Sequence, residues 1–191
     1  SDIVCTSSNA VQIVESLPVD QKIIFGPDKN LGDYVRLKTG RDLVLWNGAC
    51  MVHEIFSLDK IHQLKQQFPA AKFIAHPECE AHILQHADYV GSTSGMLKYT
   101  IENPAQQFIV ATESGILHQM QKTSPNKIFI PAPPNNVCAC NDCPHMKLNT
   151  LEKLYNCLKF ELPEIDLPAD VIQRSRKPIE RMLEISEKLG L

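Results

Sequence analysis

The chain has 191 residues, of which 43% are hydrophobic and 21% are charged, and its formal net charge is -3. Its basic residues are spread along the sequence, which argues against a nucleic-acid-binding surface, and no apolar run is long enough to span a bilayer. We therefore expect a globular protein with one or two buried cores that binds neither nucleic acid nor membrane.

In chain order, short apolar runs alternate with longer amphipathic segments. Continuous apolar runs are typical of buried parallel strands, and their alternation with helical patterns indicates βαβ units. The sequence therefore predicts an α/β fold made of repeated modules, each a short parallel sheet with helices on both faces in three αβα layers. The expected elements are helix 9–16, strand 23–25, helix 30–39, strand 43–46, helix 58–68, strand 73–75, helix 80–86, strand 89–90, helix 96–102, strand 108–111, helix 115–122, strand 128–130, helix 151–158 and helix 169–189.

Seven cysteines at irregular spacing indicate metal binding or reduced thiols, because a secreted disulfide framework normally uses an even number. The first residues also lack the charged and then apolar pattern of a signal peptide. These two features predict a cytoplasmic protein.

The second half of the chain repeats the first. Residues 50–61 (CMVHEIFSLDKI) match residues 143–154 (CPHMKLNTLEKL) position by position, so Cys50 aligns with Cys143. Upstream, the strands at 23–25 and 43–45 align with those at 108–110 and 128–130. A repeat of this length indicates a duplicated domain. It divides the chain into modules at 1–68 and 69–160, followed by a helical tail at 161–191.

The second copy begins with a strand, a turn and a helix, at residues 72–86, that have no counterpart in the first copy. The chain also does not start with Met. We therefore expect the first module to be truncated and the 191 residues to be the C-terminal part of a longer protein.

Cysteine, histidine and acidic residues follow the predicted strands, where ligands bind in parallel α/β sheets. The repeat can bring Cys50 and Cys143 to one centre as metal ligands. Two thiolates are too few for zinc or an iron-sulfur cluster, so a third module is expected to supply a further cysteine. A cluster held by three thiolates leaves one iron open as a Lewis acid.

His76 and Glu78 lie one residue apart at a strand end, where either side chain could act as a general acid or base. A structural, hydrogen-bonded histidine is the alternative for His76. The hydroxyl triplets at 6–8 and 92–94, which include Ser7 and Thr93, suit a carboxylate or phosphate at a helix start, or they simply cap the helices.

A different interpretation uses the local cysteine cluster Cys138-Ala-Cys140-Asn-Asp-Cys143. With His145 it could hold zinc, or Cys138 and Cys140 could form a redox-sensitive pair. The chain would then be a non-catalytic, zinc-stabilised α/β module that binds small anions. This interpretation does not account for Cys50.

The motifs DIVCTSSN (2–9), FGPDKNLG (25–32), WNGACMVH (46–53), HPEC (76–79), GSTS (91–94), ATESG (111–115) and CPHMKLNTL (143–151) cover nearly all of the chain. Together they resemble the quinolinate synthase family, the iron-sulfur enzymes of NAD biosynthesis. The resemblance implies three pseudo-symmetric modules around a [4Fe-4S] cluster, with Cys50 and Cys143 as two ligands and the third in a preceding module. Neither Cys5 nor Cys79 takes its place.

The resemblance also implies the reaction, in which iminoaspartate and dihydroxyacetone phosphate condense to quinolinate with loss of phosphate and two waters. An L-aspartate oxidase would supply the iminoaspartate. The implied catalytic residues are Glu78, His76 and His53, and the implied substrate contacts are Ser7, His76, Glu78, Thr93 and Met146. Without a preceding module, the 191 residues are expected to be inactive alone.

Overall fold

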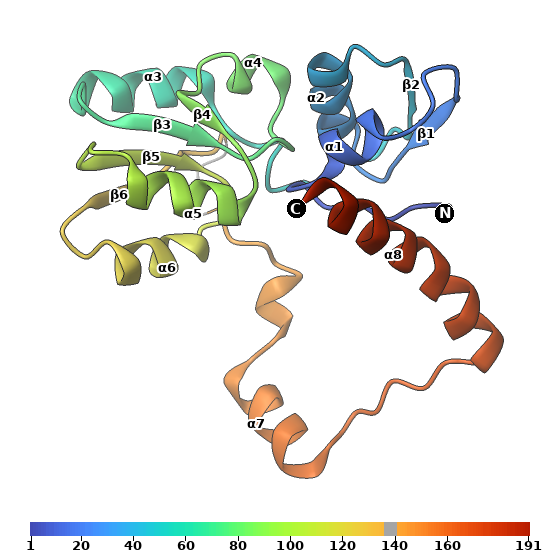
Figure 1. Ribbon diagram of the computed structural model, residues 1–191. Coiled ribbons are helices and arrows are strands. Elements are labelled where there is room, and N and C mark those ends of the chain that lie inside the picture. The colour runs from blue at the N-terminus through green and yellow to red at the C-terminus, as the bar shows by residue number, and fades with distance from the viewer. Residues whose placement is uncertain (136–140) are drawn as a thin grey trace.

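The computed structural model describes residues 1–135 and 141–191, in which helices alternate with short parallel strands. Figure 1 shows two α/β bodies side by side, built on a two-stranded and a four-stranded sheet. The α/β class expected from the sequence is confirmed. In chain order the elements are α1 (Ala10–Glu15), β1 (Ile23–Phe25), α2 (Lys29–Thr39), β2 (Leu43–Leu45), α3 (Leu58–Gln67), β3 (Lys72–Ala75), α4 (Ala81–Leu84), β4 (Tyr89–Val90), α5 (Thr93–Glu102), β5 (Gln107–Ala111), α6 (Ile116–Thr123), β6 (Ile128–Pro131), the 3-10 helix η1 (Met146–Leu148), α7 (Leu151–Phe160) and α8 (Ala169–Leu189).

The larger sheet has the strand order β4-β3-β5-β6, and all its strands run parallel. Successive side chains of a strand point to opposite faces. Phe73 and Ile109 therefore pack in one core with α3 and α4, whereas Ile74 and Phe108 pack in another with α5 and α6. Figure 1 shows these helix pairs on opposite faces of the sheet, which gives the expected three layers.

The smaller sheet pairs β1 with β2 in parallel. Phe25 and Leu43 share a core with Val14 of α1 and Val35 of α2. On the opposite face, Ile24 is 80% exposed and Val44 is 63% exposed. In the described part of the chain, helices therefore bury the Phe25 face of this sheet and leave the Ile24 face open.

Helix α3 follows Cys50 in the first copy of the repeat, yet it packs on the four-stranded sheet. Its Ile61 is 1% exposed and shares a core with Phe73 and Ile109. The repeat counterpart of Ile61 is Leu154 of α7, which is 56% exposed. The division of the chain at residue 68 stays a prediction, and this packing places α3 with the second sheet.

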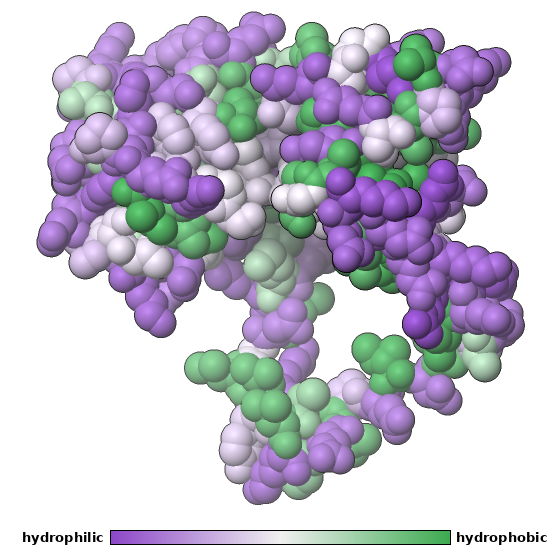
Figure 2. Space-filling view, in the orientation of Figure 1, coloured by the Kyte–Doolittle hydropathy of each residue, from purple (hydrophilic) through white to green (hydrophobic). Residues whose placement is uncertain are grey.

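Helix α7 lies away from both bodies in Figure 1, and α8 returns to contact α1. Val4 donates its backbone N–H to the carbonyl of Pro178 in α8 at 3.2 Å. Figure 2 shows hydrophobic side chains gathered over α7 and the connection that follows it. Leu158 in α7 and Ile165 in the connection are both exposed. None of the helices in the described parts of the chain is long and apolar enough to cross a membrane.

Helix α5 begins three residues earlier than the sequence predicted. The Ser92 hydroxyl accepts a hydrogen bond from the backbone N–H of Gly95 at 3.2 Å, so the cap fixes the helix start at Thr93. Capping hydroxyls satisfy backbone donors that have no partner within the helix. The same kind of cap, at Ser57 and Thr150, places the starts of α3 and α7 where the sequence predicted them.

Candidate metal and substrate site

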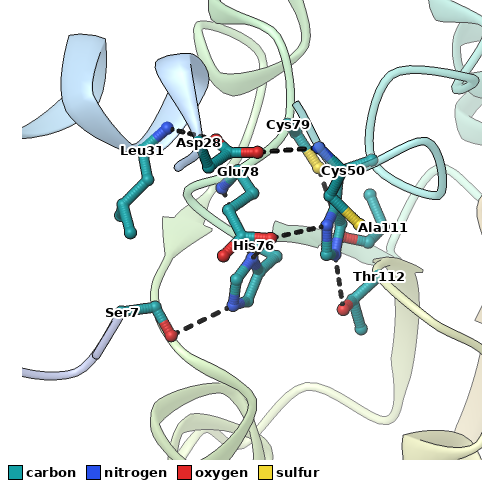
Figure 3. A network of polar contacts seen from close by, with 10 residues as sticks. Ser7, Asp28, Leu31, Cys50, His76, Glu78, Cys79, Ala111 and Thr112 are labelled. Carbon is teal, nitrogen blue, oxygen red and sulfur yellow. Dashed lines mark hydrogen bonds and ion pairs between the residues drawn. The ribbon is translucent and has the colours of Figure 1, made fainter. Parts of the chain in front are cut away.

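Side chains from both sheets converge between the carboxyl ends of the strands, as Figure 3 shows. Cys50 and His53 follow β2, His76 and Glu78 follow β3, and Thr112 follows β5. All strands are parallel within their sheets, so their carboxyl ends lie on one side, where loops can face a shared ligand. The structure thus brings together residues from both copies of the repeat.

His53 is the centre of this group. Its Nδ1 lies 3.1 Å from Oε2 of Glu78, and its Nε2 lies 3.0 Å from the hydroxyl of Thr112. The Glu78 contact has the length of an ion pair but is not aligned as a hydrogen bond, so the buried Nδ1 has no hydrogen-bond partner among the described residues. Potential ligand atoms of Cys50, His53 and Glu78 all lie within 4.8 Å of one another.

The charges of these three groups depend on one another. Burial lowers the pKa of His53, but contacts with Cys50 and Glu78 outweigh burial and raise this pKa to about 9. The contact with His53 in turn lowers the pKa of the Cys50 thiol. Burial raises the pKa of Glu78, yet the two neighbouring histidines bring it below its usual value. The lowered pKa brings Cys50 closer to the thiolate, which is the form of cysteine that binds metal.

His76 stacks on His53, with ring centroids 4.5 Å apart. The pKa values of the two rings are shifted in opposite directions. Burial and the charge on His53 lower the pKa of His76 to about 4, so its ring is neutral at pH 7. Its Nδ1 accepts the backbone N–H of Glu78 at 3.3 Å. The ring proton must then sit on Nε2, which donates to the Ser7 hydroxyl at 3.2 Å. Ser7 is left free to donate its own proton to a ligand.

The sequence did not predict Asp28 as a site residue, although its carboxylate holds the backbone of Cys50 in place. It is 7% exposed, and its Oδ2 accepts the backbone N–H of Cys50 at 2.8 Å. Its Oδ1 caps α2 by accepting the N–H of Leu31 at 2.8 Å. Thr112 was missed as well, because a single threonine after a strand carries no distinctive signal.

Cys143 lies on the loop after β6, half-buried, and its backbone N–H donates to Oε1 of Glu113 at 3.4 Å. Met146 stands in η1 and is 57% exposed. Thr93 is exposed at the first position of α5. Among the described residues, neither Met146 nor Thr93 forms a hydrogen bond or ion pair with His53, Cys50 or Glu78. Cys138 and Cys140 lie outside the described residues, and so does the local cysteine cluster that they would form.

A cavity of about 500 Å³ opens between the two hydroxyl triplets. Ser7 and Ser8 line it from one side, Ser92 and Ser94 from the other, and the cavity also reaches Lys38 and Lys98. Both triplets therefore face one space, although Thr93 is not among the lining residues. Hydroxyls and ammonium groups are suited to carboxylate or phosphate oxygens.

The donor groups around Cys50 fit a metal or an iron-sulfur cluster. Cys50 is half-buried on a loop, the pKa of its thiol is lowered, and the neighbouring Nδ1 of His53 has no aligned hydrogen bond among the described residues. Cys5 and Cys79 fit poorly, because both pack against apolar cores where burial raises the pKa of the thiol. Cys79 also donates to the carbonyl of Ala111 at 3.5 Å.

Residues 1–184 match the family model described as NadA, quinolinate synthetase A protein. The chain belongs to the quinolinate synthase family. It is 60% identical over 186 residues to the quinolinate synthase of Microcystis aeruginosa, which covers 97% of this chain and 58% of that protein. It is 61% identical over 186 residues, with the same coverage, to the quinolinate synthase of Trichodesmium erythraeum.

The quinolinate synthase of Chloroherpeton thalassium is 57% identical over 188 residues, which is 98% of this chain and 58% of that protein. The chain thus spans a little under three fifths of the length of these relatives. Membership of the quinolinate synthase family agrees with the motifs on which the resemblance was based, including those that contain Cys50, His76 and Cys143.

Proposed function

We propose that the chain forms part of a quinolinate synthase, which condenses iminoaspartate with dihydroxyacetone phosphate to quinolinate, phosphate and two waters. The supporting observation is the convergence of Cys50, His53 and Glu78 in a chain about 60% identical to quinolinate synthases. A cytoplasmic location and an L-aspartate oxidase as supplier of iminoaspartate remain predictions.

Cys50 and Cys143 would hold a [4Fe-4S] cluster as two of its cysteine ligands. When bound, such a cluster with one open iron supplies a Lewis acid that polarises a substrate atom. Both thiols are half-buried and lie on loops beyond the carboxyl ends of parallel strands. This placement supports a centre shared by the two copies of the repeat.

The chain's own residues would bind the substrates and move their protons. Glu78, whose lowered pKa keeps it a carboxylate, can accept a proton. Neutral His76 directs the hydroxyl proton of Ser7 toward a bound anion. The cavity beyond Ser7, with Lys38 and Lys98 in its walls, suits the phosphate or a carboxylate of the substrates. Thr93, at the start of α5, and Met146, in η1, would also contact substrate.

The donor set of Cys50, His53 and Glu78 also suits a zinc ion, because zinc accepts sulfur, nitrogen and carboxylate oxygen. A zinc-stabilised, anion-binding module is therefore the second candidate. It would bind phosphate but would form no quinolinate and would release no phosphate from dihydroxyacetone phosphate.

Turnover separates these functions. The protein expressed from its complete reading frame and kept free of oxygen should form quinolinate and phosphate in equal amounts from the two substrates. Cys50→Ser and Cys143→Ser should each abolish product, whereas Cys157→Ser, on the exposed face of α7, should leave the rate unchanged. If both Cys50→Ser and Cys143→Ser still form product, neither cysteine is required for the reaction.

A further inference from the structure

Two hydrogen bonds join two loops of the first body beside Cys50. The backbone N–H of Lys29 donates to the carbonyl of Gly48 at 2.7 Å, and the N–H of Cys50 donates to Asp28 at 2.8 Å. The loops are so close that a Cβ on Gly48 would come within 2.5 Å of the carbonyl oxygen of Pro27. The cysteine loop is thus fixed to the loop between β1 and α2.

The second body repeats both hydrogen bonds at the equivalent positions. The N–H of Ser114 donates to the carbonyl of Asn141 at 3.3 Å, and the N–H of Cys143 donates to Glu113 at 3.4 Å. Residues 113 and 114 lie 85 positions after 28 and 29, which is the offset between the strands β1 and β5. Residues 141 and 143 lie 93 positions after 48 and 50, which is the offset between the two cysteines.

Each acidic side chain uses both of its oxygens. Asp28 gives one oxygen to Cys50 and the other to the N–H of Leu31 at the start of α2. Glu113 gives one to Cys143 and the other to the N–H of Gly115 at 2.7 Å, just before α6. A carboxylate accepts at both oxygens, whereas an amide accepts at only one and donates from the other side. The geometry therefore requires an acid at both positions.

We propose that Asp28 and Glu113 are a matched pair of positioning residues that orient the two metal-binding cysteines. This inference rests on the function proposed above, in which Cys50 and Cys143 bind one cluster. Each carboxylate fixes the backbone of a cysteine to the start of a helix, and so fixes the direction from which the thiolate approaches the shared centre. Groups that orient metal ligands in this way set metal retention without touching the metal.

The Asp28→Asn variant separates this role from helix capping. Asn and Asp are about equally good N-caps, so Asp28→Asn keeps the cap on Leu31 but turns an amide donor toward the N–H of Cys50. Glu113→Gln makes the same change beside Cys143. Ser57→Ala is the matched control, because it removes the cap of α3, where Ser57 accepts the N–H of Lys60, and the hydrogen bonds of Ser57 to described residues include none to a cysteine.

The first readout is iron retention in the protein made from its complete reading frame without oxygen. Release of iron to a chelator should become about 10- to 100-fold faster in Asp28→Asn. Glu113→Gln should show a smaller increase, because its contact with the cysteine is longer. The midpoint potential of the cluster should shift in both variants and stay unchanged in Ser57→Ala. If both variants retain iron and potential like the parent protein, the positioning role is refuted.

The second readout does not depend on metal. In the metal-free protein, the amide hydrogens of Cys50 and Cys143 should exchange slowly; Asp28→Asn should speed exchange at Cys50 alone, and Glu113→Gln at Cys143 alone. Unprotected cysteine amides in the parent protein would overturn the pairing itself. If the parent protein holds no iron but shows this pattern of protection, the proposed cluster is contradicted. The hydrogen bonds from the two carboxylates to the cysteine backbones would still be supported.

Discussion

The imidazole rings of His53 and His76 lie face to face, with centroids 4.5 Å apart and an angle of 16° between their planes. Two imidazolium cations at this distance would repel each other. The ring that touches Cys50 and Glu78 has its pKa raised to about 9, and the ring that touches Ser7 has its pKa lowered to about 4. The stack therefore divides into a cation beside the thiol and a neutral donor beside the anion cavity.

We expect nitrogen-15 NMR of the metal-free protein at pH 7 to show two different histidines at this site. His53 should carry protons on both ring nitrogens, and His76 should be neutral with its proton on Nε2, because its Nδ1 accepts the N–H of Glu78. Ser7→Ala should perturb the Nε2 signal of His76 and leave His53 nearly unchanged. The assignment fails if His76 is the protonated ring.

Removing the carboxylate charge of Glu78 should slow the reaction. Glu78→Gln is expected to lower kcat for quinolinate formation by about 10²- to 10⁴-fold, the usual effect of losing a general acid or base. Steady-state assays of phosphate release measure this change. Glu80→Gln serves as the control, because Glu80 is two residues away with a side chain 40% exposed and its close contact is to His82. Equal rates in both variants would exclude Glu78 from proton transfer.

The two copies of the repeat should respond differently to the same truncation. Ile61→Ala opens a cavity in the core shared with Phe73 and should cost about 2–5 kcal/mol of unfolding free energy. Leu154→Ala removes an exposed side chain at the equivalent position and should change stability by no more than about 0.5 kcal/mol. Urea denaturation measures both values. A similar loss in both variants would mean that α7 is packed in solution.

Asp88 gives the fold a predictable dependence on pH. Its carboxylate accepts the N–H of Phe73 at 2.8 Å and pairs with Lys72 at 2.9 Å. Burial raises the pKa of Asp88, but these contacts outweigh burial and lower it below its usual value. A lowered carboxyl pKa stabilises the fold above the unfolded pKa, and this stability is lost as pH falls through the folded pKa.

Asp88→Asn should therefore lower the free energy of unfolding by about 1–3 kcal/mol near pH 7. The loss should become progressively smaller as the solution is acidified below the unfolded pKa of about 3.9. Unfolding free energies of both proteins across this range would show the two curves converging. A difference that stays constant with pH would indicate that the side chain acts through shape and not through its charge.

The sequence predicted most helices and strands because their signals are local. Helix α8 has the predicted bounds, and the Ser57 and Thr150 caps mark the starts of α3 and α7. The strand-end positions of Cys50 and His76 also followed from the alternation of apolar runs and helices. The sequence did not predict that α3 packs on the neighbouring sheet, because that contact joins segments on either side of a predicted boundary.

The missed site residues show a different limit. Asp28 and Glu113 occupy equivalent repeat positions, so the alignment that paired Cys50 with Cys143 contained the signal. Their role depends on hydrogen bonds to cysteine backbones 22 and 30 residues away, and side-chain direction at that range is set by the folded loops. Thr112 is similar, because its contact with His53 joins two sheets and spans 59 residues.

Counting iron and acid-labile sulfide in protein prepared without oxygen from its complete reading frame decides whether Cys50 and Cys143 hold a cluster. We expect about four of each per chain, with both lost in Cys50→Ser and in Cys143→Ser and both retained in Cys138→Ser and Cys140→Ser. A colourless protein with a single zinc, or a cluster that survives replacement of Cys50, would contradict this expectation.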